Sequence, residues 1–105
     1  MSLLVETKNK STIILINKER LDVANMQRVK EELNSIIDKG SHNLIINLSK
    51  VSFIDSSGLS ILIGLFKRVK TIRGASLSLC GLGKQPLDLL RITQLDKIFT
   101  LSKCN

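Results

Sequence analysis

A strand-to-helix junction near the middle of the chain constrains the fold more than any other feature. Residues 44–48 form a short apolar segment with the length and β-branched content of a buried strand. Residues 53–60, Phe-Ile-Asp-Ser-Ser-Gly-Leu-Ser, then open a long apolar-periodic segment that ends in a basic cluster, as a helix does. The sequence therefore places two hydroxyls and a carboxylate at the N-terminus of a helix that follows a strand.

Two kinds of chemistry fit Ser56 and Ser57 at this junction. Unpaired backbone N–H groups and the positive end of the helix dipole gather at a helix N-terminus. A phosphoryl group added there would place about two negative charges at one point of the surface. The same Asp-Ser-Ser-Gly sequence is also ordinary helix-start chemistry, because a hydroxyl at the N-cap accepts a hydrogen bond from the second or third helical N–H. Composition alone favours the cap.

Strands and helices alternate along the chain. Asp22 is placed to cap the first helix, Gly40 to end it, and Pro86 suits the first turn of the third. The expected strands are residues 5–7, 12–17, 43–48, 76–80 and 97–101, and the expected helices are residues 23–38, 57–73 and 86–93. Strands separated by helices imply parallel neighbours, and a short turn implies an antiparallel opening pair. We expect an α/β fold with a mixed, mostly parallel sheet of four to five strands and about three to four helices.

The helix expected at residues 57–73 has two apolar sides. One is a stripe broad enough to face the sheet, made by Leu62, Phe66, Val69 and Ile72 with Leu59 and Leu65 beside it. Ile61 and Gly64 lie on another side, nearer Ser56, with Arg68 one turn beyond. This second side suits partner docking. Ile61 suits a core position equally well, because the helix is apolar around much of its circumference.

Length and composition predict one small domain, residues 1–105. Apolar residues make up 43% of the chain, which supports a packed core. The core must be aliphatic, because the only aromatic residues are three Phe. The sequence has neither a signal-peptide pattern at its start nor an apolar run of about 18 residues. We therefore expect a cytoplasmic protein without a membrane span.

The formal net charge of +7 is concentrated in the second half of the chain. Residues 1–55 hold eight Lys or Arg against seven Asp or Glu, whereas residues 56–105 hold eight against two. A positive half attracts an acidic partner, with Lys67, Arg68 and Lys70 as the candidate steering residues, and it would equally attract nucleic acid or an anionic membrane surface. Direct nucleic-acid binding is disfavoured, because no aromatic side chains interleave with the basic ones and no helix-turn-helix or zinc module is visible.

Other candidate chemistry is sparse. His42 lies in a polar turn that favours a solvated residue over a general base. Cys80 is expected as a small core residue and Cys104 as a free thiol in the tail. Residues 81–84, Gly-Leu-Gly-Lys, lack the spacing of a phosphate-binding loop. Asp55 ends a strand as a phosphoacceptor aspartate does, but no acidic pair near the first strand could hold magnesium. We expect no enzyme activity, no cofactor and no metal site.

Several segments resemble STAS domains, specifically the bacterial anti-sigma factor antagonists. In that family a hydrophobic strand is followed by Asp-Ser-Ser-Gly-Leu or Asp-Ser-Ala-Gly-Leu and an amphipathic helix, as in residues 51–59 here. Residues 20–22 resemble the family's Gly-x-Leu/Ile-Asp turn, Gly74 marks the end of the second helix, and residues 95–99 resemble the closing strand. The sequence departs from the pattern at residues 19–20, where a Gly is common, and at Ser60, where a second Gly is frequent.

The resemblance implies a single STAS-like domain that acts as a phosphorylation-switched anti-sigma factor antagonist. The unphosphorylated form would bind an anti-sigma factor, often itself a serine kinase, and free the sigma factor. Phosphorylation at Ser56 would end binding, and a Ser/Thr phosphatase would restore it. The expected partner-binding residues are Asp22, Asp55, Ser56, Ser57, Gly58 and Ile61, in a monomer or weak dimer. The alternative is a constitutive STAS subunit, for example of a lipid-transport ATPase, in which Ser56 is only a helix cap.

Overall fold

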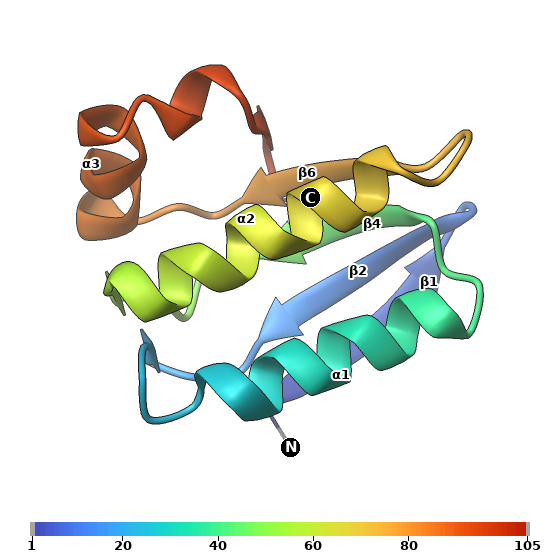
Figure 1. Ribbon diagram of the computed structural model, residues 1–105, viewed down its shortest axis with the longest axis horizontal. Helices are drawn as coiled ribbons and strands as arrows, with labels where there is room; N and C mark the ends of the chain where they lie inside the picture. Colours follow the sequence, from blue (N-terminus) through green and yellow to red (C-terminus); the bar gives the residue numbers. More distant parts are fainter. Residues whose placement is uncertain (1, 105) are drawn as a thin grey trace.

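The computed structural model describes residues 2–104 as a five-stranded mixed sheet with its main helices on one face (Figure 1). The strands of this sheet are β1 (Leu3–Lys8), β2 (Ser11–Ile16), β4 (Asn43–Asn47), β6 (Ser76–Cys80) and β7 (Thr100–Ser102). The helices are α1 (Met26–Asp38), α2 (Ser56–Lys70), α3 (Lys84–Ile92) and the 3-10 turn η1 (Leu95–Lys97). The α/β fold expected from the sequence is confirmed.

The sheet order is β1-β2-β4-β6-β7, and only the first pair is antiparallel. The β1–β2 hairpin turns at Asn9 and Lys10, whose φ angles are 52° and 70°. Two successive left-handed residues form the tight turn whose twist matches a hairpin. The antiparallel opening pair and the parallel neighbours were both predicted correctly.

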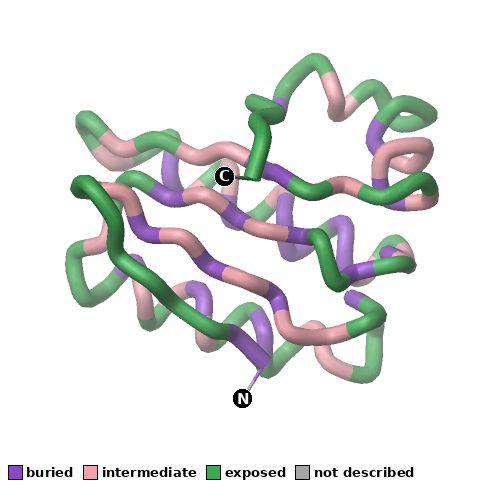
Figure 2. Tube along the Cα trace, turned by 180° about the vertical axis from the view of Figure 1, so that it is seen from behind, coloured by how far each residue is buried: buried purple, intermediate pink, exposed green. Residues whose placement is uncertain are grey.

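The core lies between the sheet and the layer formed by α1 and α2 (Figure 1). Alternate residues of the central strands, such as Ile14, Ile46 and Leu79, are fully buried beneath these helices. Leu62 of α2 and Val29 of α1 belong to the same core cluster as these strand residues. Seen from behind, the opposite face of the sheet lies in front of the helices, and apart from the buried Cys80 the residues of the central strands on this face are half-buried or exposed (Figure 2). Alternation of this kind is typical of a sheet covered on one face.

A second, two-stranded sheet joins β3 (Arg20–Leu21) to β5 (Phe53–Ile54) in parallel. Periodicity predicted neither strand, because two residues are too few to carry a period-two pattern, and only the family pattern implied a strand before Asp55. The side chain of Gln85 binds both polar backbone groups of Ile54: it accepts from the N–H at 2.8 Å and donates to the carbonyl at 2.8 Å. These contacts fix the chain immediately before α2.

Two expected boundaries were wrong. Asp22 does not cap α1, which begins at Met26 with Asn25 as its N-cap. The Asn25 side chain instead accepts from the N–H of Asp22 (3.1 Å) and donates to the carbonyl of Arg20 (2.7 Å), so a polar turn replaces the first helical turn. The expected strand at residues 97–101, like the family's closing strand at 95–99, is partly η1, and β7 begins only at Thr100.

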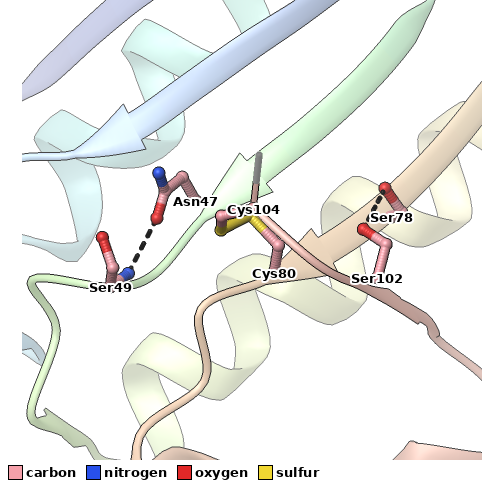
Figure 3. The surroundings of a disulfide bond; sticks show 6 residues. All are labelled: Asn47, Ser49, Ser78, Cys80, Ser102 and Cys104. Carbon is pink, nitrogen blue, oxygen red and sulfur yellow. Dashed lines mark hydrogen bonds between the residues drawn. A yellow bond between two sulfur atoms is a disulfide. The ribbon is translucent and has the colours of Figure 1, made fainter.

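The expectation of a free Cys104 was also wrong. Cys104 is joined to Cys80 by a disulfide across a sequence separation of 24 residues (Figure 3). A reducing compartment favours free thiols, but the topology of the sheet brings Cys104 next to Cys80. Because β7 pairs in parallel with β6, it carries the C-terminal residues back to the end of β6. Cys80 is buried, as expected.

Candidate functional site

The junction before α2 is capped by Asp55 and not by a serine hydroxyl. The Asp55 side chain accepts a hydrogen bond from the N–H of Gly58 at 2.9 Å, and its backbone carbonyl accepts from Leu59 at 2.9 Å. Ser56 is therefore the first residue of the helix, and its side chain is exposed. This corrects the interpretation in which Ser56 is the helix cap: a carboxylate already performs that role.

Asp55 also ties the loop before α1 to the start of α2. Its second carboxylate oxygen accepts from the N–H of Val23 at 3.3 Å, and its backbone N–H donates to the carbonyl of Leu21 at 3.2 Å. Asp55 thus joins the loop that holds Asp22 to the first turn of α2, which holds Ser56. These contacts bring Asp22, Asp55 and Ser56 into one region of the molecule.

Gly58 lies beneath this region and not on its surface. It is buried, and a Cβ atom built on it would come within 2.1 Å of the carbonyl oxygen of Leu21 and 3.0 Å of Ile54 Cγ2. Only a residue without a side chain permits α2 to approach β3 this closely. Gly58 therefore positions the exposed residues around it and does not itself offer a contact surface.

A groove between α1 and α2 runs on from the Ser56 end of α2. Its volume is about 170 Å³, and it is lined by Met26, Lys30, Leu33, Asn34, Ser60, Ile61, Gly64, Leu65 and Arg68. Ile61 is only 4% exposed and belongs to the hydrophobic core, so its edge lines the groove. Ser57 is half-buried, and its carbonyl accepts from the Ser60 hydroxyl at 2.6 Å. Ile61 is thus a core residue whose edge borders the groove.

Arg68 closes the far end of this groove and is held in place. Its guanidinium donates to the carbonyl and side-chain oxygens of Asn34 at 3.2 and 2.7 Å, and it forms an ion pair with Asp38. A cation engaged in this way contributes to the packing of α1 on α2. Among the residues expected to steer a partner, Lys67 and Lys70 are exposed, and the Lys70 ammonium lies 5.2 Å from the centre of the Phe66 ring.

Val23 is a candidate contact for a partner protein that the sequence did not reveal. It is 70% exposed and lies in the loop whose backbone binds Asp55. Val23 lies three residues before Met26 and would continue the apolar stripe of the expected helix, so the sequence favoured a core position, and only the later start of α1 leaves it exposed. Arg20 pairs with Asp22 at 3.1 Å and lies 4.3 Å from the Phe53 ring centre. The region around Ser56 thus combines an exposed hydroxyl, two carboxylates and one large apolar side chain.

Little other chemistry lies within residues 2–104. His42 is exposed, and no three His, Cys, Asp or Glu side chains of this described part gather closely enough to hold a metal ion. An exposed ion pair joins Lys84 to Asp88, whose hydrogen bond raises the pKa of Lys84 and lowers that of Asp88. In the same residues no helix combines the length and apolarity needed to cross a membrane.

Comparisons with known proteins match almost the whole chain. The family model described as "STAS domain" matches residues 3–104. The anti-sigma-B factor antagonist of Bacillus subtilis is 34% identical over 103 residues, covering 97% of this chain and 93% of the relative. The corresponding protein of Listeria monocytogenes is 32% identical over 103 residues, covering 96% and 90%.

Two solved structures share the fold. An anti-sigma-factor antagonist domain protein from Planctomyces limnophilus has a TM-score of 0.85 at 19% identity, covering 98% of this chain and 90% of that one. The Bacillus cell fate determinant SpoIIAA in its phosphorylated form has a TM-score of 0.74 at 16% identity, covering 98% and 91%. At these identities the likeness concerns the fold alone.

Proposed function

The chain belongs to the STAS domain family, and from this membership we propose that it is an anti-sigma factor antagonist switched by phosphorylation of Ser56. The names of the Bacillus and Listeria relatives, which align with nearly the whole chain, support the antagonist role. The unphosphorylated protein binds an anti-sigma factor that is also a serine kinase and thereby frees the sigma factor in the cytoplasm. Phosphorylation of Ser56 ends this binding, and a Ser/Thr phosphatase restores it.

The observation that carries the proposal is the division of roles between Asp55 and Ser56. Because Asp55 supplies the cap, the fold does not need the Ser56 hydroxyl for that purpose, and the exposed side chain is accessible to a kinase. The first turn of a helix favours a negative charge, since its N–H groups and dipole stabilise an anion. The phosphorylated protein therefore stays folded, and the effect of the phosphate falls on the partner interface.

The interface loses affinity through charge and desolvation. A phosphoserine carries about −1.5 to −2 charge at neutral pH. At Ser56 this charge adjoins the Asp55 carboxylate and the loop that holds Asp22. A partner surface that accommodates a neutral hydroxyl beside two carboxylates would have to bury a further dianion, which costs several kcal/mol when it is unpaired.

The proposed partner-binding residues have different parts in this interface. Asp22, Ser56 and the exposed side chain of Val23 provide direct contacts. Asp55 holds the two loops together, and Ser57 and Ile61 border the groove that leads away from Ser56. Gly58 acts from below by letting α2 pack against Leu21.

Three variants test the proposal by calorimetric binding to the anti-sigma factor kinase of the same organism. Ser56→Ala should bind as the parent does but escape regulation. Ser56→Asp should weaken binding by about 2–4 kcal/mol, roughly 30- to 1,000-fold in Kd. Ser35→Asp adds the same charge at an exposed position on α1 and should leave Kd within about threefold of the parent.

Incubation with the kinase and ATP, followed by peptide mass spectrometry, should place the phosphate on Ser56 and not on Ser57. Phosphate on Ser57 alone would contradict the assignment. Equal binding by Ser56→Asp and the parent would instead favour the alternative of a constitutive STAS subunit.

A further inference from the structure

We propose that Cys80 and Cys104 are a reversible thiol–disulfide pair that fixes the C-terminal strand to the sheet when oxidised and releases it when reduced. The two Cα atoms are 5.3 Å apart, within the range of about 4.4–6.8 Å that a disulfide requires. The β6–β7 register places Cys80 opposite Ser102, so the chain has only to continue past Ser102 for Cys104 to reach Cys80 (Figure 3).

Cys80 lies on the face of the sheet that α1 and α2 leave uncovered. Its partner in the register is Asn47, which shares this face with Ile45, and both of these residues are half-buried. Cys80 is only 1% exposed on the same face. The residues that line a hollow beside it include Lys103 and Cys104. The C-terminal residues therefore cover Cys80, and the bond to Cys104 fixes this cover beyond the point where the β6–β7 pairing ends at Ser102.

The strand that leads to Cys104 is weakly attached by its own side chains. β7 has three residues, all exposed, and lies at the edge of the sheet. The last buried side chain before it is Phe99, which packs edge-to-face on Phe66 with ring centres 5.4 Å apart. Among the described residues that follow Phe99, one side-chain hydrogen bond is formed, and it joins the hydroxyls of Ser102 and Ser78 at 3.3 Å. The covalent link is thus the strongest attachment of residues 100–104.

Access to the pair favours a reversible reaction. Cys104 is exposed whereas Cys80 is covered, so a small thiol or disulfide reaches Cys104 first. Exposed disulfides are the labile ones, and the neighbouring Lys103, with Lys8 on the same hollow, favours the reactive thiolate. With a low-molecular-weight disulfide such as oxidised glutathione, the Cys104 thiolate attacks one sulfur and expels a glutathione thiolate. The Cys80 thiolate then attacks the Cys104 sulfur and expels the second, so two protein thiols are oxidised and one glutathione disulfide is reduced.

The experiment equilibrates the full-length protein in buffers of reduced and oxidised glutathione and follows both mass and amide hydrogen exchange. Oxidation should remove two hydrogens from the monomer without adding glutathione. Reduction should restore them and speed exchange in residues 100–104 by about tenfold or more, while exchange in β2 and β4 stays unchanged. Cys104→Ser, changed at an exposed site, should show the fast exchange in both buffers.

Three outcomes would overturn the proposal. They are a stable glutathione adduct or an intermolecular dimer in place of the internal bond, a disulfide that millimolar reduced glutathione leaves intact in the folded protein, and equal exchange of residues 100–104 in both forms. None of these results depends on Ser56 or on an anti-sigma factor, so they test this site separately from the proposed function.

Discussion

Replacing Gly58 by Ala should destabilise the protein, although Ala is the better helix former. The added Cβ would lie 2.1 Å from the carbonyl oxygen of Leu21, so α2 must move away from β3 by roughly 1 Å. Overpacking of this kind costs about 1–3 kcal/mol. The movement also stretches the hydrogen bonds from Asp55 N–H to Leu21 and from Val23 N–H to Asp55, each worth about 1 kcal/mol. The gain from helix propensity offsets only about 1 kcal/mol, so the expected net loss is about 2–3 kcal/mol.

Gly64 supplies a matched control on the same helix. A Cβ built on Gly64 meets nothing within 4 Å, so Gly64→Ala should stabilise the protein by about 0.5–1 kcal/mol. Equilibrium urea denaturation measures both variants. With a slope of about 1.5 kcal/mol per M, the midpoint should fall by about 1.3–2 M for Gly58→Ala and rise by about 0.5 M for Gly64→Ala. If the two substitutions shift the midpoint in the same direction, the close approach of α2 to β3 is wrong.

Three further predictions follow from single contacts. Breaking the disulfide with Cys104→Ser should lower the free energy of unfolding by about 3.5 kcal/mol, because the bond restricts the chain entropy of an unfolded loop that spans 24 residues. Oxidised protein that unfolds at the same urea concentration as the variant would contradict this. Gln85→Glu should lower the free energy of unfolding by about 1–2 kcal/mol in the same assay, because a carboxylate accepts from the Ile54 N–H but cannot donate to the Ile54 carbonyl. An unchanged urea midpoint would count against the role of this residue. Lys67→Glu should slow association with an acidic partner, and stopped-flow measurements should show a far larger effect at low salt than at high salt. An unaffected association rate at low salt would exclude steering by this residue.

The strongly periodic parts of the fold were predictable from the sequence. Alternation in β6 and the apolar run of β4 identify strands, and the apolar stripes of α1 and α2 identify helices. The left-handed Gly40, with a φ of 100°, ends α1 as expected. These features depend on interactions between residues that are close in the sequence, so the sequence alone is enough to predict them.

The features that were missed depend on residues distant in the sequence. β3 and β5 exist as strands only because they pair with each other and because Gln85, on α3, binds Ile54. The disulfide of Cys104 requires β7 to lie beside β6, which no spacing of cysteines reveals. At the site itself, the motif indicated the importance of Ser56 but not that Asp55 caps the helix. That assignment depends on the hydrogen bond that the Gly58 N–H donates to the Asp55 side chain.

A competition experiment shows whether phosphorylation of Ser56 controls the release of a sigma factor. A complex of the sigma factor and the anti-sigma factor kinase is mixed either with unphosphorylated protein or with protein phosphorylated on Ser56, and free sigma factor is measured by size-exclusion chromatography. We predict that the unphosphorylated protein releases the sigma factor and that the phosphorylated protein, still folded by circular dichroism, does not. Release of the sigma factor to the same extent by both forms would contradict the account.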